Sequence, residues 1–351
     1  MFSLSAFSVI CKSRKKERSD YEKNACFKGC FDFSDCCFRR RRCFKIYSAK
    51  RENERLAAEK EAQAYPYKTV EYNGKTYDYN EGVYNLLVLG IDAEGEYEES
   101  ELFETGGKAD AIFILSINNS KKTVSTIQLN RDTVTEIQKL GVFGDPVTTL
   151  NAQLATAYAY GSGGKSSCEN MSRAVSGLLY GVPIDGYLAM NMEGIIPFVN
   201  AVGGVTVTLK DDFTKFDPEM EAGKTLTLDG AKAYIYLRGR GDVGDQLNTS
   251  RMERHRTFYS ELFKQVDKLL GSDVSKLKSV YDAIYPYSYF SISLSKLMSL
   301  YSDSSDYRRV PTVTPEGVIN EDAEYTEFYA DETALRKLVF DVWYTERQNS
   351  Q

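Results

Sequence analysis

Short apolar runs alternate with helical patterns over most of the chain after residue 84. Two runs, Leu86–Leu89 and Ile112–Leu115, lack the apolar–polar alternation of a half-exposed strand, as buried central strands do. The predicted strands are Asn85–Ile91, Ala111–Asn118, Thr123–Leu129, Tyr187–Asn191 and Val205–Leu209. The predicted helices are Asn151–Tyr160, Ser167–Tyr180, Glu193–Val202, Asp229–Tyr236 and Ser250–Leu270. This order favours an α/β fold, and we expect a three-layer α/β/α sandwich around a mixed central sheet.

The first 80 residues lack this pattern. Residues 1–45 mix Cys, Phe and four consecutive arginines without any periodicity, and we expect a poorly structured segment. Residues 46–80 are predicted to hold a short charged helix, built from good helix formers, and then a linker with a hairpin turn at Asn73-Gly74. Residues 81–275 are predicted to form the main domain, which residues 276–351 complete with further helices.

Charge and residue usage change this picture in three ways. Residues 1–65 hold 16 Lys and Arg against 9 Asp and Glu, a net charge of +7, whereas the rest of the chain carries −13. Nucleic-acid binding through Arg39–Arg42 therefore fits the tail but not the acidic domain. Six of the seven cysteines lie in the first 43 residues, but their spacing does not repeat the paired C-x2-C of zinc modules. No stretch reaches the roughly 20 consecutive apolar residues of a membrane span.

The single histidine, His255, excludes zinc sites made of several histidines and the HExxH helix of metalloproteases. Acid–base or metal chemistry must then depend on carboxylates. Asp92 ends the first predicted strand, Asp110 precedes the second, and Arg131 and Asp132 follow the third. Charged side chains at strand ends of an α/β sheet indicate the crevice in which such folds bind ligands.

Arginines supply the second half of the candidate site. Arg238 and Arg240 share one face if their segment is extended. Arg251 and Arg254 lie three apart at the start of the last predicted helix, on a stripe that continues with the core-like Phe258. Inward-facing guanidinium groups are costly unless an anion pairs with them, and a helix start suits phosphate. These features together indicate a phosphate or pyrophosphate held by arginines and bridged by Mg²⁺ to the aspartates, since only oxygen ligands are present.

Simpler readings of single residues stay open. Each aspartate also fits a turn or a helix cap, and isolated surface arginines are usually solvated. His255, taken alone, fits a hydrogen-bonding helix residue better than a catalytic base. Cys168, close to a helix start, is expected to be buried and inert.

The series of motifs, in this order, resembles the LytR-CpsA-Psr family of bacterial cell-wall phosphotransferases between about Asn85 and Arg256. The matching motifs are NLLVLGID at 85–92, KAD at 108–110, LNRDT at 129–133, IDGY at 184–187, VGGV at 202–205, LDGAKAY at 228–234, RGR at 238–240 and RMERH at 251–255. The sequence departs from the family pattern at Lys108, where Arg is usual, at Asn130, where Pro is common, and at His255, where Gln is usual.

The resemblance implies a reaction and a set of site residues. The reaction moves an anionic glycopolymer, such as a teichoic acid or a capsule polysaccharide, from an undecaprenyl-pyrophosphate carrier to peptidoglycan, with Mg²⁺ assisting cleavage of the pyrophosphate. The implied catalytic residues are Asp92, Asp110 and Arg131, of which the two aspartates organise the metal. The implied substrate-binding residues are Lys108, Arg238, Arg240, Arg251, Arg254 and His255. The general base is left open between an aspartate and His255.

The resemblance also implies partners and a place in the cell. The partners are the lipid-linked glycopolymer, peptidoglycan and the membrane surface, and the expected location is the extracytoplasmic face of a Gram-positive cell membrane. The family normally carries an N-terminal membrane span where this sequence has residues 1–45, so that segment is either a mistranslated start or the mark of a divergent soluble member. The alternative function is a non-catalytic receptor for lipid-linked or anionic glycans. Asp92 and Asp110 argue against it, because a pure anion clamp gains nothing from carboxylates.

Overall fold

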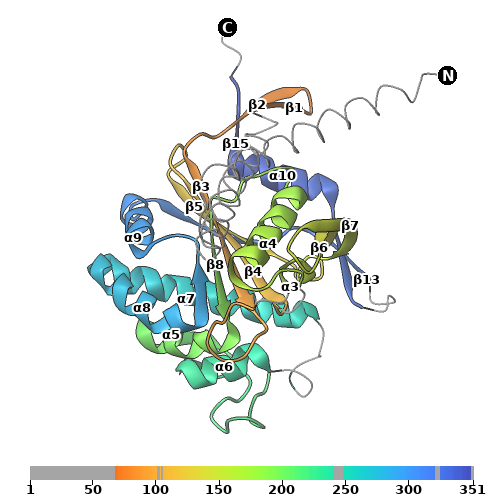
Figure 1. The fold of residues 1–351 in the computed structure, drawn as a ribbon. Coiled ribbons are helices and arrows are strands. Elements are labelled where there is room, and N and C mark those ends of the chain that lie inside the picture. Colours follow the sequence, from red (N-terminus) through yellow and green to blue (C-terminus); the bar gives the residue numbers. More distant parts are fainter. Residues whose placement is uncertain are drawn as a thin grey trace, which may run out of the picture. The chain divides into compact units, whose positions relative to one another are not determined.

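A six-stranded mixed sheet lies at the centre of the protein (Figure 1). The computed structural model describes residues 68–100, 103, 106–239, 243, 248–320 and 325–348. The strand order is β11-β8-β3-β4-β5-β12. At its centre, β4 (Ala109–Asn118) pairs antiparallel with both β3 (Val83–Ile91) and β5 (Thr123–Leu129), while β8 (Gly186–Asn191) runs parallel to β3.

The two edges of this sheet come from the last third of the chain. β11 (Ser288–Phe290) pairs antiparallel with β8, and β12 (Arg308–Val313) pairs parallel with β5. The same region contributes α8 (Leu277–Ile284), α9 (Leu294–Asp303) and α10 (Glu332–Trp343). The residues after 275 thus supply strands as well as the expected helices.

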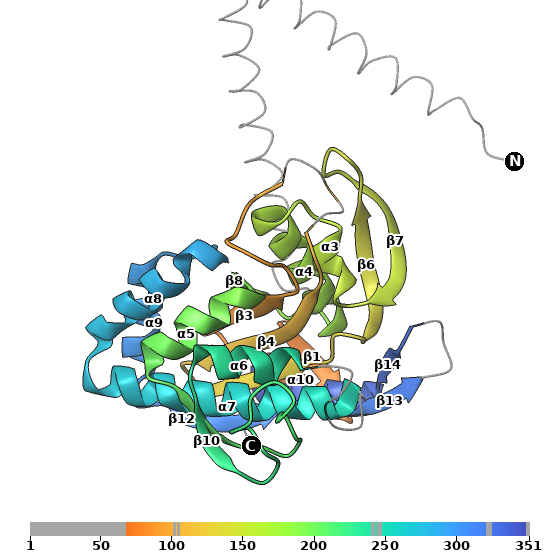
Figure 2. The ribbon, with the colours of Figure 1, turned by 90° about the horizontal axis from the view of Figure 1, so that it is seen from below.

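Helices cover both faces of the sheet, with β3 and β4 between them (Figure 2). One apolar cluster joins every second residue of β3, such as Leu87 and Leu89, to α4, α3 and α10. On the opposite face Phe113 of β4 packs edge-on against Tyr259 of α7, at 4.7 Å between ring centroids. The helices of these layers are α3 (Thr156–Ala159) and α4 (Gly164–Leu178) on one side and α5 (Ile195–Val202), α6 (Gly230–Arg238) and α7 (Asn248–Ser272) on the other. The predicted three-layer α/β/α fold is confirmed.

Smaller strand pairs surround this sandwich. They are β1 (Thr69–Tyr72) and β2 (Lys75–Tyr79) with β15 (Tyr344–Glu346), β6 (Val134–Leu140) with β7 (Pro146–Gln153), β9 (Val205–Thr208) with β10 (Thr225–Leu228), and β13 (Gly317–Asn320) with β14 (Glu327–Ala330). Short 3₁₀ turns occupy Met192–Gly194, Val274–Lys276 and Tyr285–Tyr287.

Local chemistry sets several element boundaries. Asp229 accepts a hydrogen bond from the backbone N–H of Lys232 at 2.9 Å and so caps the start of α6. Gly203 ends α5 with φ of 86°, a conformation that a residue with a Cβ rarely adopts. Asn73 and Gly74 both have positive φ between β1 and β2, which confirms the predicted hairpin turn.

The five predicted strands are confirmed to within two residues, and four of the five predicted helices form. The helix predicted over Asn151–Tyr160 is wrong. Its first residues end β7, which is rich in β-branched side chains and pairs with β6, so only Thr156–Ala159 is helical. α7 begins at Asn248, two residues before the predicted start at Ser250.

Two predictions from the start of the chain lie outside the described residues: the irregular segment 1–45 and the charged helix within Lys45–Ala64. The same holds for Arg240. Within the part of the chain that the structure describes, no helix combines the length and the apolar character needed to cross a membrane.

Candidate active site

Three strand ends bring polar residues together at one end of the central strands, not at the edge strands β11 and β12. β3 and β5 both run antiparallel to β4, so their C-terminal ends meet the N-terminal end of β4. Asp92 follows β3, Asp110 lies at the start of β4, and Arg131 and Asp132 follow β5. The sheet therefore gathers the residues that the strand-end pattern singled out.

A β-bulge redirects Asp110. Gly90 pairs with Ala111 and Ile91 pairs with Ala109, so Asp110 is the extra residue of β4 at this point. Bulges bend a strand and re-aim a side chain, and they are common next to active sites. Here the carboxylate of Asp110 points to arginines from the end of β5 and from α7.

Two arginines and two aspartates form one network of ion pairs. Asp110 Oδ1 lies in close contact with Arg131 Nη1, and Asp110 Oδ2 lies 3.8 Å from Arg251 Nη1. Arg131 Nε also pairs with Asp132 Oδ1 at 3.2 Å. The side chains of Asp110 and Asp132 are 3% and 5% exposed, whereas those of Arg131 and Arg251 are each 15% exposed. The buried carboxylates therefore hold two guanidinium groups where solvent, or an anion, reaches them.

Further hydrogen bonds hold Asp132 in place. Its backbone N–H donates to Asn130 Oδ1 at 2.9 Å, so the asparagine that departs from the family pattern forms a turn here. Gln153, at the end of β7, donates through Nε2 to Asp132 Oδ1 at 3.1 Å and to the carbonyl oxygen of Thr326 at 2.7 Å. The β6–β7 hairpin is thereby tied to the ion-pair network at its base.

Burial raises the pKa of the Asp132 carboxyl, and the neighbouring Arg131 only partly opposes this. Because the native state binds this proton more tightly than the unfolded chain does, Asp132 destabilises the fold once the pH rises through its native pKa. We expect the free energy of unfolding of the wild type to fall, relative to Asp132→Asn, as the pH rises above about 4, the ordinary pKa of an aspartate. Urea denaturation of both proteins at a series of pH values measures this difference in the free energy of unfolding. The prediction is contradicted if the free energy of unfolding of the wild type, relative to that of Asp132→Asn, stays constant or rises with pH.

The guanidinium group of Arg254 has different partners from that of Arg251. Its Nη1 pairs with Asp211 Oδ2 at 3.2 Å, and its Nη2 donates to the carbonyl oxygen of Gly239 at 2.7 Å. Its guanidinium also lies over the ring of Phe213, 5.3 Å from the centroid. Burial lowers the pKa of Arg254, and Asp211 opposes the shift. The prediction that the arginines of the helix start point inward is confirmed. Arg254 contacts the β9–β10 loop at Asp211 and the residue after α6, Gly239, rather than Asp110.

His255 is buried and makes a backbone hydrogen bond. Its Nε2 lies 3.0 Å from the carbonyl oxygen of Leu237, and since a carbonyl only accepts, this nitrogen carries the proton. The bond links α7 to the end of α6. This geometry suits a hydrogen-bond donor that positions the two helices.

The remaining candidates lie on the solvent side of the same end of the sheet. Asp92 and Lys108 are exposed, and the backbone N–H of Asp92 donates to the carbonyl oxygen of Lys108 at 2.9 Å. Arg238, at the end of α6, pairs through Nη2 with Glu94 Oε1 at 3.0 Å and also donates to the hydroxyl of Tyr234. The end of α6 therefore reaches the loop that follows Asp92.

Sequence reasoning missed Tyr259, Gln153 and Asp211 as parts of this region. Burial raises the pKa of the Tyr259 hydroxyl, and the charge of Asp110 adds to the shift. Tyr259 lies eight residues after Arg251 on the same helix, so the helical stripe contained a signal for it. No local signal could have shown Gln153 or Asp211, because their partners are distant in sequence.

Asp92 and Asp110 provide carboxylate oxygens at this end of the sheet, the ligand type that Mg²⁺ prefers. His255 and the buried Cys168 are engaged elsewhere in the fold. Among the described residues no group of three or more His, Cys, Asp or Glu side chains could hold a metal ion. Mg²⁺ commonly uses only one or two carboxylates and completes its shell with waters and substrate phosphates.

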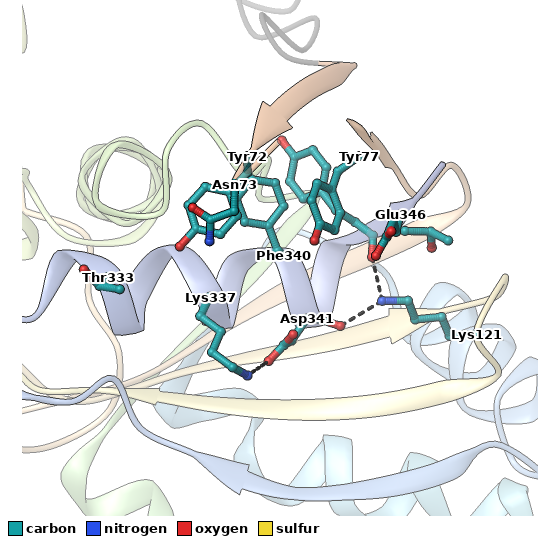
Figure 3. Close-up of a pocket in the computed structure, with 11 residues that line it drawn as sticks. Tyr72, Asn73, Tyr77, Lys121, Thr333, Lys337, Phe340, Asp341 and Glu346 are labelled. Atoms are coloured by element: carbon teal, nitrogen blue, oxygen red, sulfur yellow. Dashed lines mark hydrogen bonds and ion pairs between the residues drawn. The ribbon is translucent and has the colours of Figure 1, made fainter. Parts of the chain in front are cut away.

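A surface pocket of about 600 Å³ lies at the other end of the sheet (Figure 3). Tyr72 stacks on Phe340 of α10, with 4.6 Å between ring centroids. Lys121 Nζ donates to the carbonyl oxygens of Asp341 and Tyr344, both at 2.8 Å, which satisfies the end of α10. These contacts fasten the β1–β2 hairpin and the β4–β5 turn to α10. The pocket contains none of the predicted site residues.

Comparison with known proteins gives the family. The model of the LytR_cpsA_psr family matches residues 44–339. Biofilm regulatory protein A of Streptococcus mutans is 28% identical over 265 residues, which cover 72% of this chain and 62% of that protein. The polyisoprenyl-teichoic acid–peptidoglycan teichoic acid transferase TagU of Bacillus cereus is 32% identical over 167 residues, which cover 46% of this chain and 48% of that protein. The matched region thus spans between 48% and 62% of the length of these two relatives.

A solved structure has the same fold. TagT bound to LI-WTA superimposes with a TM-score of 0.55 at 22% sequence identity, covering 80% of this chain and 96% of that one. The family model spans the central sheet and the ion-pair network, and the motifs that suggested the resemblance lie within it. The chain belongs to the LytR_cpsA_psr family.

Proposed function

We propose that this protein transfers an anionic glycopolymer from a polyprenyl-pyrophosphate carrier to peptidoglycan. The observation that carries the proposal is the network in which Asp110 lies between Arg131 and Arg251 at one end of the sheet. The name of the TagU relative, a polyisoprenyl-teichoic acid–peptidoglycan teichoic acid transferase, supports the same class of donor and acceptor. We propose the outer face of the cell membrane as its place of action, because both substrates meet there.

The partly exposed guanidinium groups of Arg131 and Arg251 grip the pyrophosphate. Each presents a planar fork of donors that matches phosphate oxygens, and Asp110 and Asp132 behind them hold the forks in position. Lys108 and Arg238 add positive charge from the solvent side of the same end. Phosphoryl transfer depends mainly on alignment and charge neutralisation, which preorganised arginines supply.

The proposed reaction is one displacement at phosphorus. An acceptor hydroxyl oxygen of peptidoglycan forms a bond to the phosphorus that carries the glycopolymer, and the bond from that phosphorus to the bridging oxygen breaks. The prenyl phosphate leaves with the bonding electrons, and a carboxylate at the site accepts the hydroxyl proton. Asp92 and Asp110 would hold Mg²⁺, which supplies neutralisation of the phosphate charge.

A direct assay tests this function. The full chain is incubated with a polyprenyl-pyrophosphate-linked glycopolymer, with Mg²⁺, and with or without peptidoglycan fragments. The expected result is polymer joined to peptidoglycan by a phosphodiester, together with free prenyl phosphate. The alternative, a non-catalytic receptor for lipid-linked glycans, predicts that the substrate binds but that no prenyl phosphate appears.

His255→Gln is expected to retain most of the transfer rate. A glutamine amide can donate to the carbonyl oxygen of Leu237, as the ring Nε2–H does at 3.0 Å. If His255 were the general base, the same change would lower the rate by roughly 10²-fold or more. The measurement is the pH–rate profile of the variant and the wild type. Loss of the acidic limb in the variant, together with a large fall in rate, would make His255 the base.

A further inference from the structure

The tip of the β6–β7 hairpin exposes three large apolar side chains. Phe143 is 89% exposed, Val142 is 76% exposed and Val147 is 68% exposed. The apolar residues nearer the base behave differently, since Ile137 and Leu140 are buried at 1% and 2% exposure. The hairpin thus contributes to the core along its length and presents apolar surface only at its end. Exposed apolar patches of this kind mark sites of interaction.

The tip has a defined backbone. The N–H of Gly141 donates to the carbonyl oxygen of Asp145 at 2.9 Å, and the N–H of Gly144 donates to that of Gly141 at 2.8 Å. Gly144 has φ of 77°, and a Cβ there would meet the ring of Phe103 at 2.7 Å. These bonds satisfy polar backbone groups inside the turn itself. Phe143 and Val142 are therefore held outward by a closed turn.

The base of the same hairpin belongs to the candidate active site. β6 begins two residues after Asp132, and Gln153 at the end of β7 donates to Asp132 Oδ1 at 3.1 Å. Each strand of seven or eight residues is about 25 Å long. Figure 2 shows the hairpin beside α3 and α4, with the turn between β6 and β7 extending past these helices. It is an arm with the ion-pair network at one end and apolar side chains at the other.

The size and chemistry of the tip favour a lipid surface as its occupant. A stable protein interface buries about 800 Å² on each partner, more than three protruding side chains supply. A bilayer needs no complementary shape, and apolar side chains enter the boundary between its headgroups and acyl chains. Internally bonded turn backbone also lowers the cost of leaving water.

We propose that Val142, Phe143 and Val147 insert into the lipid surface that contains the prenyl carrier, and that the hairpin thereby places the arginine network at the membrane. This inference rests on the proposed function for the identity of the substrate. The insertion itself is measured without that substrate.

Tryptophan fluorescence tests the insertion. The chain has one tryptophan, Trp343, which is fully buried and gives a constant background. Phe143→Trp in the full chain is mixed with vesicles of phosphatidylglycerol and phosphatidylethanolamine. We expect its emission to shift to shorter wavelength on addition of vesicles. The matched control is Val318→Trp on β13, a position that is 71% exposed, and it should not shift. No shift for Phe143→Trp, or an equal shift for both, would overturn the proposal.

Phe143→Asp separates membrane placement from catalysis. It should lower co-sedimentation with these vesicles at least 10-fold relative to Val318→Asp, and lower transfer from a long-chain carrier embedded in vesicles. Transfer from a short-chain, water-soluble prenyl pyrophosphate should stay unchanged. If the wild type transfers from neither carrier, the proposed function fails, while vesicle binding still decides the role of the tip. Unchanged vesicle binding, with or without an altered oligomeric state in sedimentation, would overturn the proposal, and an altered oligomeric state would assign the tip to a protein interface.

Discussion

Asp110→Asn is expected to lower the rate of glycopolymer transfer by about 10²- to 10³-fold without unfolding the protein. The bulge in β4 aims the carboxylate of Asp110 at Arg131 and Arg251, and its side chain is 3% exposed. The asparagine side chain has nearly the same shape as that of aspartate and can still accept a hydrogen bond from Arg131. It removes the negative charge that orients both guanidinium groups and that would bind Mg²⁺. Single-turnover release of prenyl phosphate at several Mg²⁺ concentrations measures the loss.

The control for this variant is Asp267→Asn. Asp267 pairs with Arg309 at 3.0 Å, in another part of the molecule, and is 37% exposed. The same chemical change there should leave the transfer rate close to that of the wild type. A folded Asp110→Asn protein with unchanged rate would remove Asp110 from the site.

Arg131→Ala is expected to affect both activity and stability. The transfer rate should fall by about 10²- to 10³-fold, because a guanidinium fork that stabilises charge in the transition state is lost. The free energy of unfolding should fall by about 3–5 kcal/mol, since Asp110 and Asp132 stay buried after their shared partner is gone. Transfer assays and urea denaturation measure the two effects separately.

Two variants make the Arg131 result specific. Lys108→Ala removes an exposed ammonium, a point charge without a fork, and should cost less in transfer rate and little in stability. Arg131→Lys should recover stability better than activity, because it restores charge but not paired donors. Equal rate losses for Arg131→Ala and Lys108→Ala would contradict the ranking.

The location of the candidate site was predictable because chain direction and strand ends suffice to place it. Asp92, Asp110 and Arg131 interrupt or follow apolar strands, and an α/β sheet brings such ends together. The inward direction of Arg254 was predictable from its helical stripe with Phe258. Its partner was not, because Asp211 lies 43 residues earlier in the chain and no local pattern links the two.

Other parts of the site depend on irregular geometry. Regular alternation along β4 places residue 110 on the face of the sheet that α4 covers. Only the bulge turns its side chain toward α7 on the other face. The helix predicted over Asn151–Tyr160 failed for a related reason: pairing with β6 outweighs local helical preference in β7. That pairing also creates the arm whose base holds Asp132.

By itself the sequence determined the α/β class, the central strands and the identity of the family, because buried apolar runs and motif order are local properties of the chain. Only the tertiary structure decided which arginines share Asp110, that His255 bonds the backbone of Leu237, and that apolar side chains stand at the end of an arm from the site. These depend on pairing between residues far apart in the chain. Such pairing follows from the packing of the whole sheet and its helices, which no local pattern encodes.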